Sequence, residues 1–313
     1  MKILITGVAG YIGSQLAKYL VENKCVVYGL DINPIPAKIQ NFIPQESYLQ
    51  IDLSLECNKD ILQKFIRKIG ADLTIIHLAA LKSVEDSALN PDNYWNNNFG
   101  STLNLLDVMK FNEVKKLVFA SSAAVYDPIN EICNEGDSCA PISVYGKIKF
   151  AEEQLIREFS KLTNSRIAIL RFFNVAGAIG HEFREASGKN LMPKILEASE
   201  KKLNFEIYGV DYPTRDGSCI RDFIHVEDLL SAILKSCEKI EKQSVGIVNL
   251  GSNQGATVLE VLTEFRKYVN VESINKNRRS GDTPTLLASN NKAKEILRWE
   301  PVHDLSSIVT LFV

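Results

Sequence analysis

The first half of the chain alternates short apolar runs with longer amphipathic segments. The apolar runs predict strands over residues 2–6, 25–30, 47–51, 73–78, 115–120 and 165–171. The amphipathic segments predict helices over residues 11–23, 55–69, 92–110 and 143–163. Short apolar strands separated by helices are typical of parallel βαβ units, in which each strand is buried on both faces. We therefore predict an α/β fold with a doubly wound parallel sheet of the Rossmann type.

The pattern becomes less regular after Arg171. Gly-, Pro- and polar-rich stretches separate short predicted helices near residues 191–201, 226–239 and 257–269. Ligands of an open α/β sheet bind beyond the carboxyl ends of the strands, so irregular segments late in the chain are well suited to cover them. We expect these segments to form a smaller, mixed α/β lobe that binds a substrate.

The composition excludes several other classes of protein. The chain has 313 residues, and its 36 basic and 38 acidic residues leave a net charge of −2, which would not attract nucleic acid or an anionic membrane. Its six cysteines contain no C-x-x-C pair and its four histidines are scattered, so we expect no metal site. Early glycines interrupt the apolar amino terminus, and no apolar stretch approaches the roughly 20 residues that cross a bilayer. We expect a cytoplasmic protein with reduced thiols.

Three glycines follow the first predicted strand and open the first predicted helix. Gly7, Gly10 and Gly13 have the spacing G-x-x-G-x-x-G. In a dinucleotide-binding turn, the first glycine permits a tight bend, the second lets a pyrophosphate approach the backbone, and the third lets helix and strand pack closely. A tight strand-to-helix turn needs glycine even when it binds nothing, so this motif alone is a weak signal.

Asp31 ends the second predicted strand, 18 residues after Gly13. An acid at about this offset binds the adenosine ribose hydroxyls of a dinucleotide, and its charge repels a 2′-phosphate. The alternative is that Asp31 only forms a turn at the end of the strand. Together with the glycines, Asp31 favours binding of NAD rather than NADP.

A candidate catalytic group follows the fifth predicted strand. Ser122 lies at the end of that strand, and Tyr145 and Lys149 project from one face of the next helix because they are four residues apart. A tyrosine with its ordinary pKa of about 10 is a poor base at neutral pH, but a nearby ammonium favours the phenolate. Ser122 would orient the alcohol that gives up its proton. The alternative is an amphipathic helix with a surface lysine, which the position after a dinucleotide turn makes the weaker interpretation.

These residues, together with five longer segments, carry a resemblance to a known family. The segments are residues 77–84, 96–100, 171–178, 190–193 and 208–226. From residue 1 to about residue 301 the chain resembles the NAD-dependent epimerases and dehydratases of the extended short-chain dehydrogenase/reductase family, and within it the UDP-sugar 4-epimerases. The last segment is the most discriminating, since it belongs to the part of the family that binds a sugar nucleotide.

The resemblance implies a set of NAD contacts. Tyr11 and Ile12 would bind the pyrophosphate, Asp52 and Leu53 would flank the adenine, and Phe173 would close over the cofactor. The full set implied for NAD is Gly7, Gly10, Tyr11, Ile12, Gly13, Asp31, Asp52, Leu53, Leu78, Ala79, Ala80, Leu81, Lys82, Asn97, Ser122, Tyr145, Lys149 and Phe173. Residues 1–172 with about 222–250 would form the NAD-binding Rossmann domain.

The resemblance also implies a UDP-sugar site and a homodimer. The implied substrate contacts are Lys82, Ser122, Tyr145, Asn174, Asn190, Leu191, Glu206, Ile207, Tyr208, Arg221, Arg279, Asp282 and Leu286. Arginines suit a diphosphate because their fork geometry matches phosphate oxygens. Leu286 occupies the position that sets the size of the sugar pocket, and its intermediate size leaves the sugar open. Residues from about 173 to 221 with 251–313 would form the UDP-sugar-binding lobe.

The two residues that follow Ser122 help to distinguish between the reactions of this family. Relatives that dehydrate or decarboxylate nucleotide sugars need a further acid or base there, and this chain has Ala123 and Ala124. The resemblance therefore implies reversible C4 epimerisation of a UDP-hexose, UDP-galactose to UDP-glucose, with Tyr145 as base. Alternatives are 4-epimerisation of a UDP-N-acetylhexosamine, UDP-pentose or UDP-hexuronate. A non-catalytic NAD-binding redox sensor is a further alternative, but it would not need Ser122, Tyr145 and Lys149 together.

Overall fold

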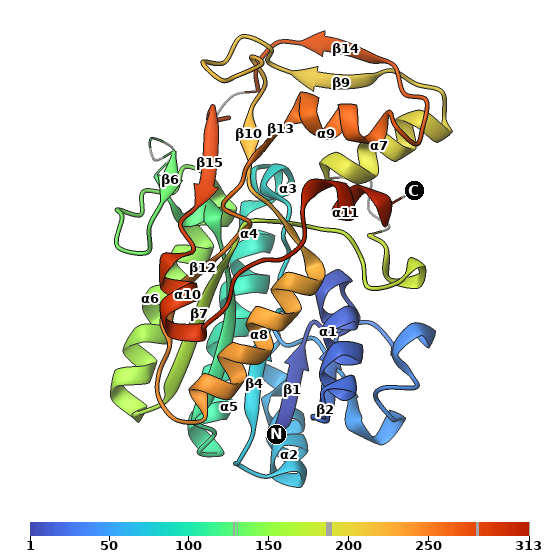
Figure 1. The fold of residues 1–313 in the computed structure, drawn as a ribbon. Helices are drawn as coiled ribbons and strands as arrows, with labels where there is room; N and C mark the ends of the chain where they lie inside the picture. Colours follow the sequence, from blue (N-terminus) through green and yellow to red (C-terminus); the bar gives the residue numbers. More distant parts are fainter. Residues whose placement is uncertain (128, 130, 186–189, 280–281, 313) are drawn as a thin grey trace. The chain divides into compact units, whose positions relative to one another are not determined.

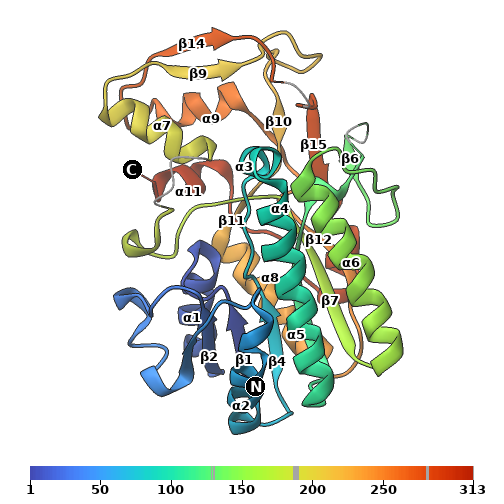
Figure 2. The same ribbon diagram turned by 180° about the vertical axis from the view of Figure 1, so that it is seen from behind.

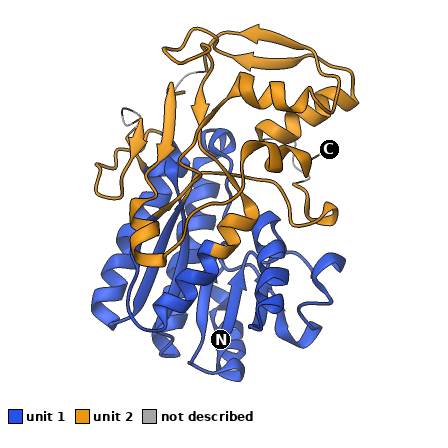
Figure 3. Cartoon of the chain, in the orientation of Figure 1, with its two compact units in different colours: residues 1–125, 143–171, 232–248 blue, residues 126–142, 172–231, 249–313 orange. Residues whose placement is uncertain are grey.

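The computed structural model describes residues 1–127, 129, 131–185, 190–279 and 282–312 (Figure 1). The chain divides into two compact units (Figure 3). Unit 1 comprises residues 1–125, 143–171 and 232–248, and unit 2 comprises residues 126–142, 172–231 and 249–313. These boundaries differ from the expected ones at residues 126–142 and 222–231, which belong to unit 2.

The regular elements are numbered along the chain. The strands are β1 Lys2–Thr6, β2 Val26–Asp31, β3 Tyr48–Gln50, β4 Thr74–His77, β5 Lys116–Ser122, β6 Ile132–Cys133, β7 Arg166–Phe172, β8 Asn174–Ala176, β9 Phe205–Tyr208, β10 Ile220–Arg221, β11 Phe223–His225, β12 Gly246–Leu250, β13 Ala256–Thr257, β14 Ser273–Lys276 and β15 Thr285–Ala288. The α-helices are α1 Tyr11–Glu22, α2 Lys59–Ile69, α3 Val84–Leu89, α4 Pro91–Tyr94, α5 Gly100–Phe111, α6 Val144–Thr163, α7 Leu191–Glu200, α8 Val226–Ile240, α9 Val258–Phe265, α10 Asn291–Leu297 and α11 Leu305–Thr310. The shorter helices are η1 Ala37–Ile39, η2 Gln45–Ser47, η3 Glu56–Asn58, η4 Trp95–Phe99, η5 Ala123–Val125 and η6 His181–Phe183.

A seven-stranded sheet forms the centre of unit 1. Its strand order is β12-β7-β5-β4-β1-β2-β3. The pairs of β1 with β2 and β4, of β2 with β3, and of β4 with β5 are all parallel. The chain runs outward from β1 to β3 and then returns to β4, so the carboxyl ends of β1 and β4 lie side by side. The doubly wound parallel sheet is confirmed, and ligands of such sheets bind where the strand order reverses.

The side chains of unit 1 alternate between the two faces of this sheet. Leu4, Ile75 and Leu117 share one buried cluster with side chains from α2, α5 and α6, which cover that face (Figure 2). Ile3 and Ile5 are fully buried and point to the opposite face, where α1 lies (Figure 1). Burial on both faces explains why these strands have short, continuous apolar sequences.

The helix predicted over residues 92–110 contains a π-helical turn. The structure has α4, a π-helical turn over η4, and then α5. A π-turn inserts an extra residue into the helical ladder, and such turns are frequent at functional sites. Here the turn contains Asn98, whose side chain is fully buried. The predicted helix is therefore present, and the π-turn within it is a local departure that the apolar pattern did not predict.

Unit 2 contains the smaller sheets and a separate core. Its sheets have the orders β13-β10-β15-β6, β11-β8 and β14-β9. Its core gathers apolar side chains from α7, α9 and α11, with Ile207 and Phe265 among those buried. The expected smaller, mixed lobe is therefore present. In the part of the chain that the structure describes, no helix is long and apolar enough to cross a membrane.

Candidate active site

The glycine turn joins β1 to α1 and is packed against the neighbouring strands. Gly7 has a φ of +73°, and a Cβ there would lie 2.7 Å from the backbone nitrogen of Ala79. A Cβ on Gly13 would lie 2.2 Å from the carbonyl oxygen of Gly7. Packing alone requires glycine at these two positions. Gly7 and Gly13 are therefore explained by a tight strand-to-helix turn, whether or not the turn binds a ligand.

Gly10 differs from the other two glycines. The nearest atom to a Cβ on Gly10 would be the Gly7 carbonyl oxygen at 3.2 Å, so the surrounding protein only mildly disfavours a side chain there. Gly10 is the N-cap of α1 and supplies no side-chain cap, and the first helical bond is donated by Ser14 N to Gly10 O at 3.0 Å. The first N–H groups of a helix have no acceptor within the helix, and with the helix dipole they favour binding of an anion at this end. This end of α1 therefore fits a pyrophosphate.

Asp31 lies at the end of β2 and is 6% exposed. Its carboxylate accepts hydrogen bonds from Ala9 N at 2.9 Å and from the backbone and side chain of Asn33, both at 3.0 Å. Asp31 thus has a structural role, because it ties the glycine turn to the end of β2. A carboxylate offers about four acceptor positions, which leaves one for a ribose hydroxyl. Its contact with ribose stays a prediction.

The two residues implied for the adenine lie beyond β3. The Asp52 carboxylate accepts hydrogen bonds from Ser54 N at 2.9 Å and Ser54 Oγ at 2.6 Å. The side chain of Leu53 belongs to the core of unit 1, and its carbonyl accepts a hydrogen bond from Asn104 Nδ2 at 3.0 Å. The segment is therefore held in place by α5. Its contact with adenine stays a prediction.

The segment after β4 is held by a residue that the sequence analysis did not single out. Asn98 accepts a hydrogen bond from Leu81 N at 2.7 Å and donates one to Leu81 O at 2.9 Å. Its neighbour Asn97, predicted to contact the nicotinamide, is only half-buried. The Lys82 ammonium lies 5.6 Å from the centre of the Tyr11 ring. The sequence indicated a polar segment here through three consecutive asparagines, residues 96–98. Only the structure of the π-turn shows that Asn98 is the one that points inward.

Ser122, Tyr145 and Lys149 come together in unit 1. The first turn of α6 is capped by Ser143, whose hydroxyl accepts from Gly146 N, and Tyr145 N donates to Ser87 Oγ at 3.2 Å. The Ser122 hydroxyl, at the end of β5, hydrogen-bonds the Tyr145 phenol. The Lys149 ammonium is buried and lies 4.6 Å from the centre of the Phe119 ring. The grouping predicted from spacing is present, and the roles of its members stay predictions.

The pKa of the Tyr145 phenol is raised above its usual value. The largest cause is burial of the phenol among protein atoms, although the residue as a whole keeps some exposed surface. The Lys149 charge and the Ser122 hydrogen bond lower this pKa, as expected, but Glu152 raises it. In the protein without a ligand, burial and Glu152 together outweigh the lysine. The expected effect of the lysine is present, but the net pKa of the phenol stays above its usual value.

His77, at the end of β4, is buried between two hydroxyl groups. Its Nδ1 lies 2.6 Å from Thr6 Oγ1, and its Nε2 lies 3.1 Å from Thr102 Oγ1. Burial, assisted by the charge of Lys149, lowers the pKa of His77 to about 3. His77 is therefore neutral at physiological pH.

This histidine should make stability depend on pH. Unfolded, His77 regains a pKa near 6.5, so between pH 6.5 and 3 only the unfolded chain binds this proton and stability falls as the pH falls. Lowering the pH from 7.5 to 5.5 should cost about 1.4 kcal/mol through this group. Denaturant unfolding at both pH values should show that the free energy of unfolding falls less in His77→Gln than in the wild type. The exposed His181, replaced by Gln, should keep the wild-type loss. Equal losses in His77→Gln and the wild type would contradict the assignment.

In unit 2, several residues predicted to bind UDP lie on adjacent strands. Arg221 in β10 pairs in register with Leu286 in β15. The Arg221 guanidinium donates to the carbonyls of Ile220 at 2.9 Å and Thr283 at 2.8 Å, and lies 3.3 Å from the Asp282 carboxylate. Asn174, at the start of β8, donates its backbone N–H to Asp222 O at 2.9 Å. Arg221 is thus an oriented, half-buried cation rather than a mobile surface charge.

A second group of these residues surrounds β9. The Arg279 guanidinium lies 3.9 Å from the centre of the Tyr208 ring, and the Tyr208 hydroxyl bonds Glu206. Ile207 is buried in the core of unit 2, which leaves its backbone rather than its side chain for a ligand. Asn190, just before α7, donates to both oxygens of Glu185. Phe173 also lies in unit 2, with its ring 6.5 Å from that of Tyr126.

Two histidines that are far apart in the sequence stack in unit 2. The ring centres of His225 and His303 are 4.2 Å apart, and Glu227 lies beside them. Nδ1 of His225 accepts from Glu227 N at 3.1 Å, and Nδ1 of His303 lies 3.0 Å from Asp228 Oδ1. One ligand atom from each of His225, Glu227 and His303 lies within 4.8 Å of the others, and Nε2 of His225 is buried without a hydrogen-bond partner. These three side chains are therefore a candidate metal site, which the sequence analysis did not expect.

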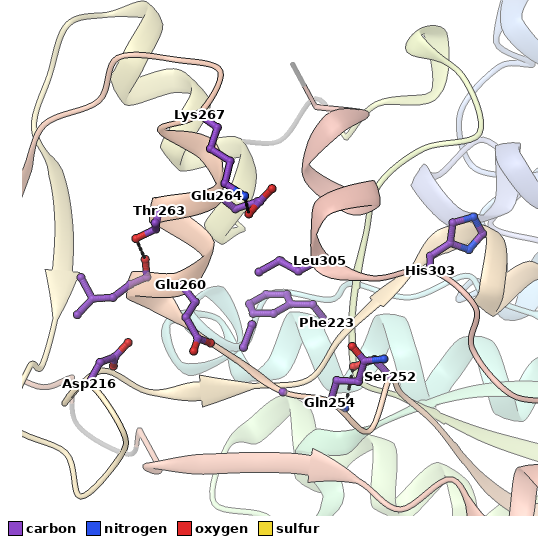
Figure 4. Close-up of a pocket in the computed structure, with 13 residues that line it drawn as sticks. Asp216, Phe223, Ser252, Gln254, Glu260, Thr263, Glu264, Lys267, His303 and Leu305 are labelled. Carbon is purple, nitrogen blue, oxygen red and sulfur yellow. Dashed lines mark hydrogen bonds and ion pairs between the residues drawn. The ribbon is translucent and has the colours of Figure 1, made fainter.

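Unit 2 also contains a cavity of about 670 Å³ beside α9. Its wall contains three carboxylates, from Asp216, Glu260 and Glu264. The Lys267 ammonium pairs with Glu264 at 2.6 Å (Figure 4). His303 and Leu305 complete the wall from the carboxyl-terminal segment. No residue that the sequence analysis assigned to a cofactor or substrate lines this cavity.

The glycine turn, the parallel sheet and the Ser-Tyr-Lys group together define a class of protein. The chain belongs to the NAD dependent epimerase/dehydratase family, whose model matches residues 3–251. The predicted family resemblance is confirmed. The chain is similar to UDP-glucose 4-epimerase of Halalkalibacterium halodurans, with 36% identity over 311 residues that cover 96% of this chain and 91% of that protein.

A second relative and a solved structure support the same grouping. The bifunctional UDP-glucose 4-epimerase and UDP-xylose 4-epimerase 1 of Pisum sativum is 35% identical over 319 residues, covering 96% of this chain and 91% of that protein. The crystal structure of UDP-glucose 4-epimerase from Brucella ovis in complex with NAD superimposes with a TM-score of 0.89 at 30% identity. The superposition covers 99% of this chain and 96% of the Brucella ovis chain.

Proposed function

We propose that this chain is an NAD-dependent enzyme that interconverts UDP-galactose and UDP-glucose by epimerisation at C4. The observation that carries the proposal is the grouping of Ser122, Tyr145 and Lys149 in a member of the epimerase/dehydratase family. The relatives named UDP-glucose 4-epimerase support the choice of substrate. The redox-sensor alternative has no use for this group of three side chains.

NAD fits the residues of unit 1. The uncapped first turn of α1 after Gly10 suits the pyrophosphate, and the Asp31 carboxylate keeps an acceptor position for the adenosine ribose. Asp52 and Leu53, the segment from Leu78 to Lys82, and Asn97 complete the proposed set in this unit, and Phe173 is added from unit 2. When bound, NAD supplies reversible acceptance of a hydride from the sugar carbon. The crystal structure of the Brucella ovis relative in complex with NAD supports this assignment.

Tyr145 moves the proton in this proposal. Its phenolate takes the proton of the 4-hydroxyl group, and the same phenol returns it when the hydroxyl re-forms on the other face of C4. Ser122 orients the sugar oxygen, and the ammonium of Lys149 stabilises the phenolate. Ala123 and Ala124 follow Ser122, so these two positions supply no second acid or base for dehydration. The proton leaves and returns at the 4-oxygen and the hydride leaves and returns at C4, so no net oxidation results.

Unit 2 is proposed to hold the UDP part of the substrate. Arg221 and Arg279 supply charge for the diphosphate, with Asn174, Asn190, Leu191, Glu206, Ile207, Tyr208 and Asp282 as its other proposed contacts. Leu286, in register with Arg221, leaves the choice of sugar open. The Pisum sativum relative is named for both glucose and xylose forms, which keeps the UDP-pentose alternative in view. A homodimer and a cytoplasmic location stay predictions.

The proposed function predicts a specific product pattern. Purified protein given UDP-galactose should form UDP-glucose without stoichiometric release of NADH, because the hydride returns to the same carbon. Chromatography of the nucleotide sugars and absorbance at 340 nm measure the two products. A panel with UDP-N-acetylglucosamine, UDP-xylose and UDP-glucuronic acid separates the alternatives. Stoichiometric free NADH with no UDP-glucose would refute the epimerase assignment.

A further inference from the structure

Glu152 is a buried carboxylate that the sequence motifs do not include. It lies on α6 one turn beyond Lys149, its side chain has no exposed surface, and its Oε2 is 3.1 Å from the Lys149 ammonium. A buried charge is stable only when it is paired and hydrogen-bonded. The adjacent Glu153 is already accounted for, because Arg171 and Ser121 bond it. Glu152 therefore differs from its neighbour in facing the proposed catalytic lysine.

The other oxygen of Glu152 ends a chain of hydrogen bonds. The Thr102 hydroxyl donates to Glu152 Oε1 at 2.5 Å, so its oxygen must accept from His77 Nε2. Neutral His77 then accepts at Nδ1 from the Thr6 hydroxyl, whose oxygen accepts from Ala79 N at 3.3 Å. Every donor in this chain points toward Glu152. The chain begins at the backbone of the segment predicted to contact NAD and ends at the carboxylate beside Lys149.

We propose that Glu152 is a positioning residue, which holds the ammonium of Lys149 beside Tyr145 and is itself held by the hydrogen-bonded chain through Thr102 and His77. This inference rests on the proposed role of Tyr145 as the base. Two elements besides α6 support Glu152, since Thr102 comes from α5 and His77 from β4. The arrangement restrains Lys149 without help from a bound ligand.

The charge of Glu152 also acts on the phenol. The titratable groups that act on the pKa of Tyr145 are Lys149 and Glu152 from α6 and Tyr94 from α4, and His77 from β4 lies within the influence of Lys149. His77 is neutral, so Lys149 and Glu152 are the charges that matter, and Glu152 opposes the lysine. Removing the negative charge should make the phenolate easier to form. A purely structural carboxylate, without this electrostatic role, would leave the titration of Tyr145 unchanged.

The first test is a tyrosinate titration of ligand-free protein. Absorbance at 295 nm is followed against pH for Glu152→Gln and for the wild type, and each curve is corrected with the matching Tyr145→Phe variant. The amide oxygen of glutamine can still accept from Lys149 although the negative charge is gone, so the Tyr145 midpoint should fall by about 1 pH unit in Glu152→Gln. A midpoint that does not move would overturn the proposal. This readout does not depend on turnover, so failure of wild-type epimerase activity would count against the proposed function and not against this inference.

A second pair of variants tests the hydrogen-bonded chain from His77 through Thr102 to Glu152. These variants remain informative if Glu152→Gln does not fold. Thr102→Val keeps the shape of the side chain but removes the hydroxyl, whereas Thr102→Ser keeps the hydroxyl. If the chain holds Glu152, Thr102→Val should lower kcat about tenfold with little change in KM, and Thr102→Ser should stay within about twofold of the wild type. Equal losses in the two variants would show that only packing matters and would overturn the proposal.

Discussion

Tyr145→Phe should lower kcat by about a thousandfold, the usual range for removing a positioned acid–base group. The substitution deletes the hydroxyl that moves the proton but keeps the ring that fills the site. UDP binding should stay within about twofold, because the proposed UDP contacts are in unit 2 and the phenol acts only in the chemical step. Steady-state interconversion of UDP-galactose and calorimetric titration with UDP measure the two quantities.

Tyr94→Phe is the matched control for this prediction. Tyr94 is also a buried tyrosine, 4% exposed, and its electrostatic influence raises the pKa of Tyr145. Its substitution removes a hydroxyl from the same part of unit 1, so any general effect of that loss should appear in both variants. Tyr94→Phe should retain near-normal turnover. If the two variants lost activity equally, or if Tyr145→Phe lost UDP affinity and turnover in parallel, Tyr145 would not be the base.

Gly13→Ala should destabilise unit 1 and weaken NAD binding. The added Cβ would lie 2.2 Å from Gly7 O and 2.8 Å from Val8 Cα, and neither backbone atom can rotate away. The start of α1 must therefore move, at a cost of about 3 kcal/mol in the free energy of unfolding. If this turn binds the pyrophosphate as proposed, displacing its backbone N–H groups should weaken NAD binding by about a hundredfold. Denaturant unfolding and titration of the ligand-free protein with NAD measure the two effects.

Gly136→Ala provides the control for the glycine turn. No atom lies within 4 Å of a Cβ at Gly136, which belongs to unit 2 and is exposed. This substitution adds the same methyl group without a clash, so it should change neither unfolding nor NAD affinity. If Gly13→Ala bound NAD as tightly as Gly136→Ala, the turn at Gly13 would not form the pyrophosphate site.

The parallel sheet was predictable because burial on both faces imposes a local pattern. Each of the six strands predicted in the first half is present in the central sheet, with ends that differ by one or two residues. The seventh strand, β12, was missed. Its sequence Gly246–Leu250 is short, and glycines at 246 and 251 make it look like part of a loop. Only its pairing at the edge of the sheet beside β7 makes it a strand.

The candidate site divides in a similar way. The spacing of Tyr145 and Lys149 on one helix and the glycines of the turn are local properties, and the structure brings these residues to the expected places. Asn98 and Glu152 have no such local signature, because an asparagine in a polar run and a glutamate on a helix are ordinarily solvated. Each became important only through partners far away in the chain, Leu81 for Asn98 and Thr102 for Glu152.

The sequence by itself determined the fold class, the family and the residues that could move a proton, because periodicity, glycine spacing and side-chain chemistry are properties of short segments. The tertiary structure alone decided the electrostatics of Tyr145. Burial raises its pKa, Lys149 lowers it and Glu152 opposes the lysine. The physical reason is that desolvation and Coulomb energies depend on distances between β4, α4, α5 and α6, which no local pattern encodes.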